Sequence, residues 1–312
     1  MNPEIRLHVE PGVVKSWDAF RRESPPCSIA LDGYVDGPPD FDHDGPYANF
    51  DHHRGVNRLA TRSTAGQVLV AIYLGLFESF SEGGKPLANV FVNDCDQDVC
   101  MAYWLLVNAG QVSELRIEMT IAQLIIIEDL LDATAGAIPA DPNRPTIRKQ
   151  AWAFELYDAA RATGDLQRMN TDEMRGLIEA TAERLSQIAL GNGEQRDLVG
   201  DYEVLRGGPT WQMIRERGQH ARTILFAQGV RAFVAVRDLE PGRYAYTIGR
   251  MSPFVDFPIE RIYDALNQAE NCIDPHNRWG GSDTIGGSPR SQGSRLTPQD
   301  VEAIVEGVVQ GG

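Results

Sequence analysis

The chain has 312 residues, of which 42% are hydrophobic and 23% charged, and this composition fits a globular protein of one or two domains and excludes a disordered or collagen-like chain. Its four cysteines include no Cys-x-x-Cys pair, which argues against a disulfide framework or cysteine zinc site and favours a cytoplasmic location. The first residues do not resemble a signal peptide, and no apolar run reaches the roughly 20 residues of a membrane span, so we expect no membrane partner.

The net charge of −15 lies entirely in residues 1–205, which hold 17 basic and 32 acidic residues. Residues 206–312 are neutral, with 12 arginines, no lysine and 12 acids. Such an acidic chain is not expected to bind duplex nucleic acid. A carboxylate-rich half can instead bind metal cations, and arginines in the other half can bind phosphate oxygens through their planar guanidinium groups.

The first half of the chain alternates predicted strands and helices. Short apolar segments predict buried strands at residues 28–31 and 89–92. Helices are predicted over residues 65–77, capped by Ser63 and Thr64, and over 101–109. The apolar segment 121–131 is compatible with either state. This alternation predicts an α/β fold with a doubly wound, mainly parallel sheet.

The pattern changes near residue 200. Before this position, amphipathic helices are predicted over residues 148–162 and 172–190. After it, the pattern predicts a hairpin over 231–248 and a helix over 259–270. A glycine-rich loop over 279–295 and a last helix capped by Thr297 complete the chain. We therefore expect a metal-binding domain over residues 1–200 and a smaller α+β domain over 201–312 that binds substrate phosphate.

Acids and histidines concentrate between residues 32 and 53. Six aspartates and three histidines occur there, a density that core packing does not explain. Oxygen and imidazole donors together suit Mn²⁺, Fe²⁺, Zn²⁺ or Mg²⁺, although a solvated polar loop is the simpler alternative. The residues are Asp32, Asp36, Asp40, Asp42, His43, Asp44, Asp51, His52 and His53.

Two further acidic clusters lie downstream. Asp94, Asp96 and Asp98 directly follow an apolar strand, where ligand sites of parallel sheets form, although helix capping would explain one of them. Asp129 and Asp132 adjoin the apolar residues 125–127 and need a partner if they are buried.

Asp51-His52-His53 followed by Ser63-Thr64-Ala65 resembles the signature of the DHH phosphoesterase superfamily, which includes exonucleases, cyclic-dinucleotide phosphodiesterases, inorganic pyrophosphatases and exopolyphosphatases. The family's Asp-x-Asp motif is similar to the cluster at residues 94–98. In the family that motif precedes Asp-His-His, whereas here it follows by about forty residues, which implies reordered motifs. Val99 also stands where many members carry glycine.

The resemblance implies a catalytic pair, His53 and Asp51, and a site for two divalent ions, most readily Mn²⁺. His53 would meet the phosphate or protonate the leaving oxygen, and Asp51 would bridge the ions or hold an imidazole in place. Water activated by the metal would hydrolyse a phosphodiester or phosphoanhydride of a small nucleotide or polyphosphate-like substrate. The implied metal ligands are His52, Asp94, Asp96, one acid from among Asp32, Asp36, Asp42 and Asp44, and Asp129, with Asp132 as an alternative to the last.

The glycine-rich loop near the C-terminus is similar in kind to the family's phosphate-binding loop. Glycines let backbone N–H groups approach an anion, and serines and arginines add donors and charge. The expected substrate-binding residues are Arg278, Gly280, Gly281, Ser282, Gly286, Gly287, Ser288 and Arg290.

A competing interpretation is a protein without enzymatic activity. Residues 40–51 carry aspartates at calcium-loop spacing, but the prolines before them oppose an incoming helix. A calcium- or nucleotide-binding protein, or a descendant that has lost its activity, therefore stays an alternative to the phosphoesterase. The sequence leaves the substrate, the metal and any homo-oligomer open.

Overall fold

A computed structural model describes residues 2–114, 119–134, 136–272, 274, 277–289 and 291–311. The chain divides into two compact units, one made of residues 1–136 and 143–197 and the other of residues 137–142 and 198–312. The short segment 137–142 thus belongs with the C-terminal unit, which sequence reasoning did not anticipate. Arg290 lies outside the described residues.

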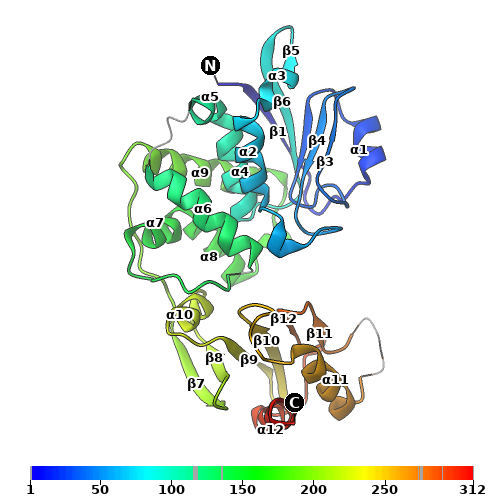
Figure 1. The fold of residues 1–312 in the computed structure, drawn as a ribbon, viewed down its shortest axis with the longest axis vertical. Coiled ribbons are helices and arrows are strands. Elements are labelled where there is room, and N and C mark those ends of the chain that lie inside the picture. The colour runs from blue at the N-terminus through cyan, green and yellow to red at the C-terminus, as the bar shows by residue number, and fades with distance from the viewer. Residues whose placement is uncertain are drawn as a thin grey trace. The chain divides into compact units, whose positions relative to one another are not determined.

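The first unit is built on a mostly parallel sheet in the order β1-β6-β2-β4-β3, with β5 paired to β6 (Figure 1). The pairs β1–β6, β6–β2 and β2–β4 are parallel, whereas β3 and β5 are antiparallel to their neighbours. The strands are β1 (Glu4–Val9), β2 (Ser28–Leu31), β3 (Asp40–Asp42), β4 (Tyr47–Phe50), β5 (Ser81–Glu82) and β6 (Lys85–Val92).

Helices cover this sheet unequally, with most of them on one face and α1 on the other (Figure 1). The larger core lies between the sheet and α2, α4 and α9, and the smaller one gathers aromatic side chains under α1. The helices are α1 (Trp17–Glu23), α2 (Thr64–Tyr73), α3 (Leu76–Ser79), α4 (Gln97–Val107), α5 (Ala109–Ser113), α6 (Met119–Ala133), α7 (Pro145–Ala153), α8 (Glu155–Thr163) and α9 (Thr171–Ala189), with 3-10 turns η1 (Arg58–Ala60) and η2 (Leu166–Arg168).

The parallel pairing brings the carboxyl ends of β2, β4 and β6 to one edge of the sheet. Asp32 follows β2, Asp51-His52-His53 follow β4, and Asp94 to Asp98 follow β6. Segments that are about sixty residues apart in the chain therefore end side by side. The α/β class with a mainly parallel sheet is confirmed.

Several elements differ from the sequence prediction for identifiable reasons. The helix expected over residues 65–77 ends at Tyr73, because Gly75 adopts a left-handed conformation, and α3 begins after it. β3 and β4 lie within residues 32–53, where the sequence predicted no strand. The segment 121–131 is helical within α6. The helix predicted over residues 172–190 is present as α9, and Asn170 and Glu173 form a capping box at its start.

The second unit is an antiparallel-rich sheet in the order β11-β12-β10-β9-β8-β7, in which only the pair β8–β9 is parallel among the described strands. Separate apolar cores lie on its two faces, one of them under α11 and α12 and the other under α10. The elements are β7 (Tyr202–Gly207), β8 (Gln212–Glu216), α10 (Ala221–Ala227), β9 (Ala232–Glu240), β10 (Arg243–Arg250), α11 (Ile259–Glu270), β11 (Gly280–Gly281), β12 (Ile285–Gly287) and α12 (Pro298–Gln310).

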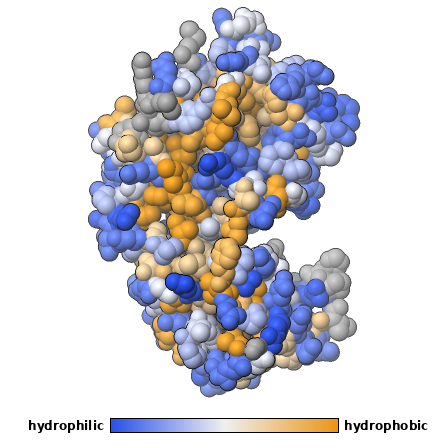
Figure 2. Space-filling view, viewed as in Figure 1, coloured by the Kyte–Doolittle hydropathy of each residue, from blue (hydrophilic) through white to orange (hydrophobic). Residues whose placement is uncertain are grey.

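The surface of the first unit carries an apolar stripe over α2 and α6 (Figure 2). Leu74, the C-cap of α2, is 81% exposed, and Ile126 of α6 is 60% exposed. Within the described residues, no helix combines the length and the apolar character that crossing a bilayer requires.

Candidate metal centre

His53 is oriented by the aspartate two residues before it. The Asp51 carboxylate is buried and accepts hydrogen bonds from the backbone N–H groups of His52 and His53. The same oxygen lies 2.8 Å from Nδ1 of His53. This contact is the largest influence on the imidazole and raises the pKa of His53. The His53 side chain is 39% exposed, so one edge of the ring faces out of the site.

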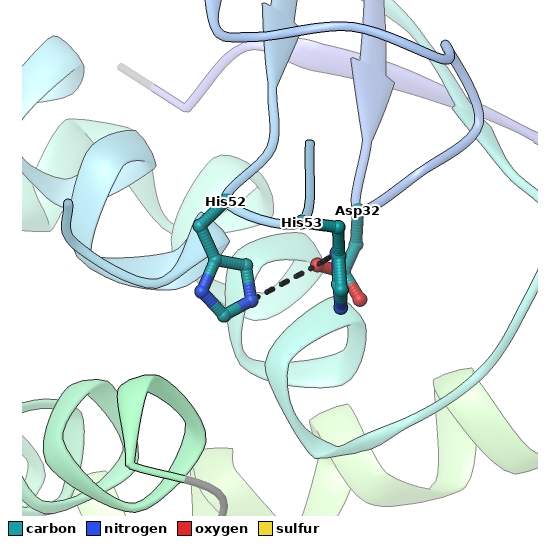
Figure 3. Close-up of side chains that lie close together, drawn as sticks. All are labelled: Asp32, His52 and His53. Carbon is teal, nitrogen blue, oxygen red and sulfur yellow. Dashed lines mark ion pairs between the residues drawn. The ribbon is translucent and has the colours of Figure 1, made fainter. Parts of the chain in front are cut away.

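His52 lies beside His53, with ring centroids 4.5 Å apart, and is completely buried. Its Nε2 lies 2.6 Å from Oδ2 of Asp132, 3.7 Å from Oδ1 of Asp32 and 3.9 Å from Oδ2 of Asp98. Asp32 also lies 3.5 Å from Nδ1 of His53, so it stands between the two imidazoles (Figure 3). Two groups of possible ligands result, one formed by Asp32, His52 and His53 and the other by His52, Asp98 and Asp132.

The start of α2 positions two of these carboxylates. Asp98 accepts hydrogen bonds of 2.6 and 2.8 Å from the backbone N–H groups of Thr64 and Ala65, at the positive end of the helix. Thr64 Oγ1 donates to Asp32 at 2.9 Å. The Ser63-Thr64-Ala65 motif therefore holds an acid from β2 and an acid from α4 against one helix terminus.

Desolvation and mutual repulsion dominate the electrostatics of the site. Burial, followed by repulsion from neighbouring acids, raises the pKa of Asp32, Asp98 and Glu128 well above the usual range. The same causes raise the pKa of Asp96 to about 6. Burial also acts against ionised Asp132, but its contact with His52 leaves the pKa of this carboxyl lowered. Such a concentration of buried carboxylates is neutralised either by protonation or by a bound cation.

The unpaired atoms of the site fit a divalent cation. Nδ1 and Nε2 of His52 and Oδ2 of Asp132 are buried and have no hydrogen-bond partner among the described residues. Nε2 of His52 and Oδ2 of Asp132 are in ion-pair contact at 2.6 Å, but their relative orientation is outside that of a regular hydrogen bond. Buried polar atoms are ordinarily paired, so two acceptors directed at the same space indicate ligands for an ion. Imidazole and carboxylate donors together suit Mn²⁺, Zn²⁺ or Fe²⁺.

Other acids singled out from the sequence have different partners. Asp96 caps α4 by accepting a hydrogen bond from the N–H of Val99. Its negative charge also contributes to the raised pKa of Asp32, so Asp96 lies close to the two groups. Asp94 is exposed and accepts from the N–H of Cys95.

Besides Asp94 and Asp96, several more of the predicted ligands lie outside both groups. Asp42 pairs with Arg21, Asp44 lies in an exposed turn, and Asp129 accepts from the N–H of Ser63 and pairs with Arg62 at 3.3 Å. Asp132, the alternative to Asp129, is the acid of α6 that contacts His52. Helical spacing places these two acids three residues apart, so only the packing of α6 against α2 distinguishes them.

The glycine-rich loop of the second unit forms a hairpin in which Gly280 pairs with Gly287 and Gly281 with Gly286. A Cβ atom on Gly286 would lie 2.3 Å from the carbonyl oxygen of Gly280 and from the Tyr263 hydroxyl, so close packing within the hairpin requires glycine there. Ser282 accepts from the N–H groups of Thr284 and Ile285, Ser288 accepts from that of Tyr246, and Arg278 is exposed.

Comparison with known proteins adds a distant structural likeness. A solved structure of an exopolyphosphatase-related protein from Bacteroides fragilis is similar over 99% of this chain and 92% of that chain, with 10% sequence identity and a TM-score of 0.32. No family model and no curated protein matches the sequence. A likeness at this level assigns neither a family nor a substrate, so the functional conclusion depends on the residues of the site.

Proposed function

We propose that this protein is a metal-dependent phosphoesterase of the DHH type that hydrolyses a phosphodiester or phosphoanhydride. The observation that carries the proposal is the set of unpaired ligand atoms on His52 and Asp132 among buried carboxylates. These side chains follow the carboxyl ends of parallel strands or line the helices behind them, where open α/β sheets bind ligands.

The two imidazoles have separate tasks in this proposal. His52, Asp32, Asp98 and Asp132 would hold the metal, with Asp96 beside them, and Mn²⁺ is the first choice. The two groups share Nε2 of His52, whose single lone pair binds one ion, so a second ion would be held by the carboxylates. A divalent cation there would lower the pKa of water and neutralise charge on the phosphoryl oxygens. His53, oriented by Asp51 and partly exposed, is placed to donate a proton to the leaving oxygen.

The second unit is proposed to bind the substrate phosphate through the hairpin at Gly280–Gly287 and Arg278. The glycines pair across the hairpin, and the Ser282 hydroxyl already accepts a hydrogen bond within it. The donors to a phosphate would therefore be backbone N–H groups and neighbouring arginines. The proposed substrate is a small phosphorylated molecule. The acidic first unit disfavours duplex nucleic acid as a partner.

The proposal is tested by measuring bound metal and hydrolysis on the same preparation. We expect elemental analysis to find a divalent transition metal. We also expect hydrolysis of at least one member of a panel containing a cyclic dinucleotide, a dinucleotide, pyrophosphate and polyphosphate. A chelator should abolish turnover and Mn²⁺ should restore it. Metal-dependent stabilisation without turnover on any substrate would favour the binding protein instead.

A further inference from the structure

Three arginines follow the Asp-His-His motif at intervals of four residues, and their partners differ. Arg54 pairs with Asp36 at 3.0 Å, and Arg62 pairs with Asp129 at 3.3 Å, both outside the two ligand groups. Arg58, at the start of η1, donates from Nη2 to the carbonyl oxygen of Asp132 at 3.1 Å. The same nitrogen lies 3.6 Å from Oδ1 of Asp132. Of these three arginines, Arg58 is the one attached to a residue that contacts His52.

The Arg58 guanidinium, which contacts Asp132, has one N–H group without a hydrogen-bond acceptor in the described part of the chain. Its Nε is buried and has no acceptor among the described residues, while the side chain as a whole is 40% exposed. An N–H group left in that state costs roughly 1–3 kcal/mol. Arginine is always ionised, so the group cannot avoid the cost by losing its proton.

Among the described residues, both hydrogen-bond acceptors and a positively charged donor without partners therefore lie near Asp132. His52 and Asp132 present acceptor atoms that suit a cation, and Arg58 presents a cationic donor that suits an anion. A metal ion alone would leave Nε of Arg58 unsatisfied, and a phosphoryl group alone would be repelled by the acids. A phosphoryl oxygen placed beside a bound metal would satisfy both sets, because arginine matches phosphate in geometry and charge.

We propose that Arg58 binds a non-bridging phosphoryl oxygen of the substrate at the metal centre, an inference that rests on the proposed phosphoesterase function. The contacts of Nη2 with Asp132 hold the guanidinium in place before the substrate arrives. The Arg58 charge also acts on His53, where it partly opposes the rise in pKa that Asp51 causes.

The test compares Arg58→Gln and Arg58→Lys with Arg54→Gln, a matched removal of an arginine that pairs with Asp36. Calorimetry measures the binding of Mn²⁺ alone and then of inorganic phosphate to the Mn²⁺-loaded protein. We expect all variants to bind Mn²⁺ within about twofold of wild type. Arg58→Gln should lose at least tenfold in phosphate affinity, with Arg58→Lys intermediate and Arg54→Gln unchanged, because lysine keeps the charge but not the planar fork.

Three results would overturn the inference. They are unchanged phosphate affinity in Arg58→Gln, an equal loss in Arg54→Gln, and a tenfold loss of Mn²⁺ affinity in Arg58→Gln, which would mean that Arg58 merely supports Asp132. The readout is separate from the test of the proposed function, because it requires no turnover. If wild type binds Mn²⁺ and phosphate but hydrolyses nothing, the phosphoesterase proposal fails while the role of Arg58 in anion binding stands. If Mn²⁺-loaded wild type binds no phosphate, the role of Arg58 fails.

Discussion

Asp32→Asn is expected to stabilise the metal-free protein while weakening its metal binding at least tenfold, or about 1.4 kcal/mol. Asp32 is buried, and burial and the surrounding acids raise its pKa. Its φ of 51° is left-handed, a conformation that asparagine adopts readily. The amide keeps an oxygen to accept from Thr64, so the substitution removes mainly charge and ligand strength.

The gain in the free energy of unfolding should be about 1–2 kcal/mol in the presence of chelator. Two full like charges 4 Å apart near a protein surface repel each other by roughly 4 kcal/mol. The expected gain is smaller, because the raised pKa of Asp32 means that protonation already relieves part of this repulsion. Urea unfolding with chelator and with saturating Mn²⁺ measures both effects. Asp44→Asn, at an exposed turn, is the control and should change neither. A variant that is less stable without metal and binds Mn²⁺ normally would contradict the assignment of Asp32 as a ligand.

His53→Ala is expected to lower turnover by about 10²–10⁴-fold, the contribution of a positioned general acid. The His53 imidazole is held by Asp51 and has one exposed edge, so its removal should leave the buried contacts of His52 intact. Steady-state hydrolysis, with the metal content of each preparation measured by elemental analysis, tests this expectation. The metal content should stay close to that of wild type.

The matched control is His43→Ala. His43 lies in the same stretch of sequence but is exposed and packs against the Phe41 ring, away from both ligand groups. It should retain full turnover. Unchanged hydrolysis in His53→Ala would remove His53 from the catalytic machinery. Loss of both metal and hydrolysis would instead make His53 chiefly a ligand, as its 3.5 Å approach to Asp32 allows.

Much of the architecture could be predicted from local pattern. The apolar segments that became β2 and β6, the hairpin of β9 and β10, and helices α9, α11 and α12 follow from periodicity and capping residues. Elements with weaker patterns were missed, among them β3 and β4 in a segment rich in proline, glycine and aspartate. There the neighbouring strand β2 supplies the hydrogen bonds that local propensity does not favour.

The cluster at residues 94–98 comes later in the chain than Asp51-His52-His53, yet the sheet places both at one edge. In the sheet, β2 lies between β4 and β6, so residues after β6 meet those after β2 and β4 although they come later in the chain. A metal site requires ligands that converge in space, and parallel strand ends provide that convergence whatever their sequence order.

The sequence by itself determined that acids follow the two apolar strands β2 and β6, and that Asp51-His52-His53 lie between them in the chain. Only the tertiary structure decided which acids converge on His52, because ligand distances depend on how strands pair and helices pack. The packing of α6 places Asp132 against His52 and turns Asp129 toward Ser63, and the pairing of Asp42 with Arg21 removes another candidate. The contact of Arg58 with Asp132 spans 74 residues of sequence, a separation at which local pattern carries no information about distance.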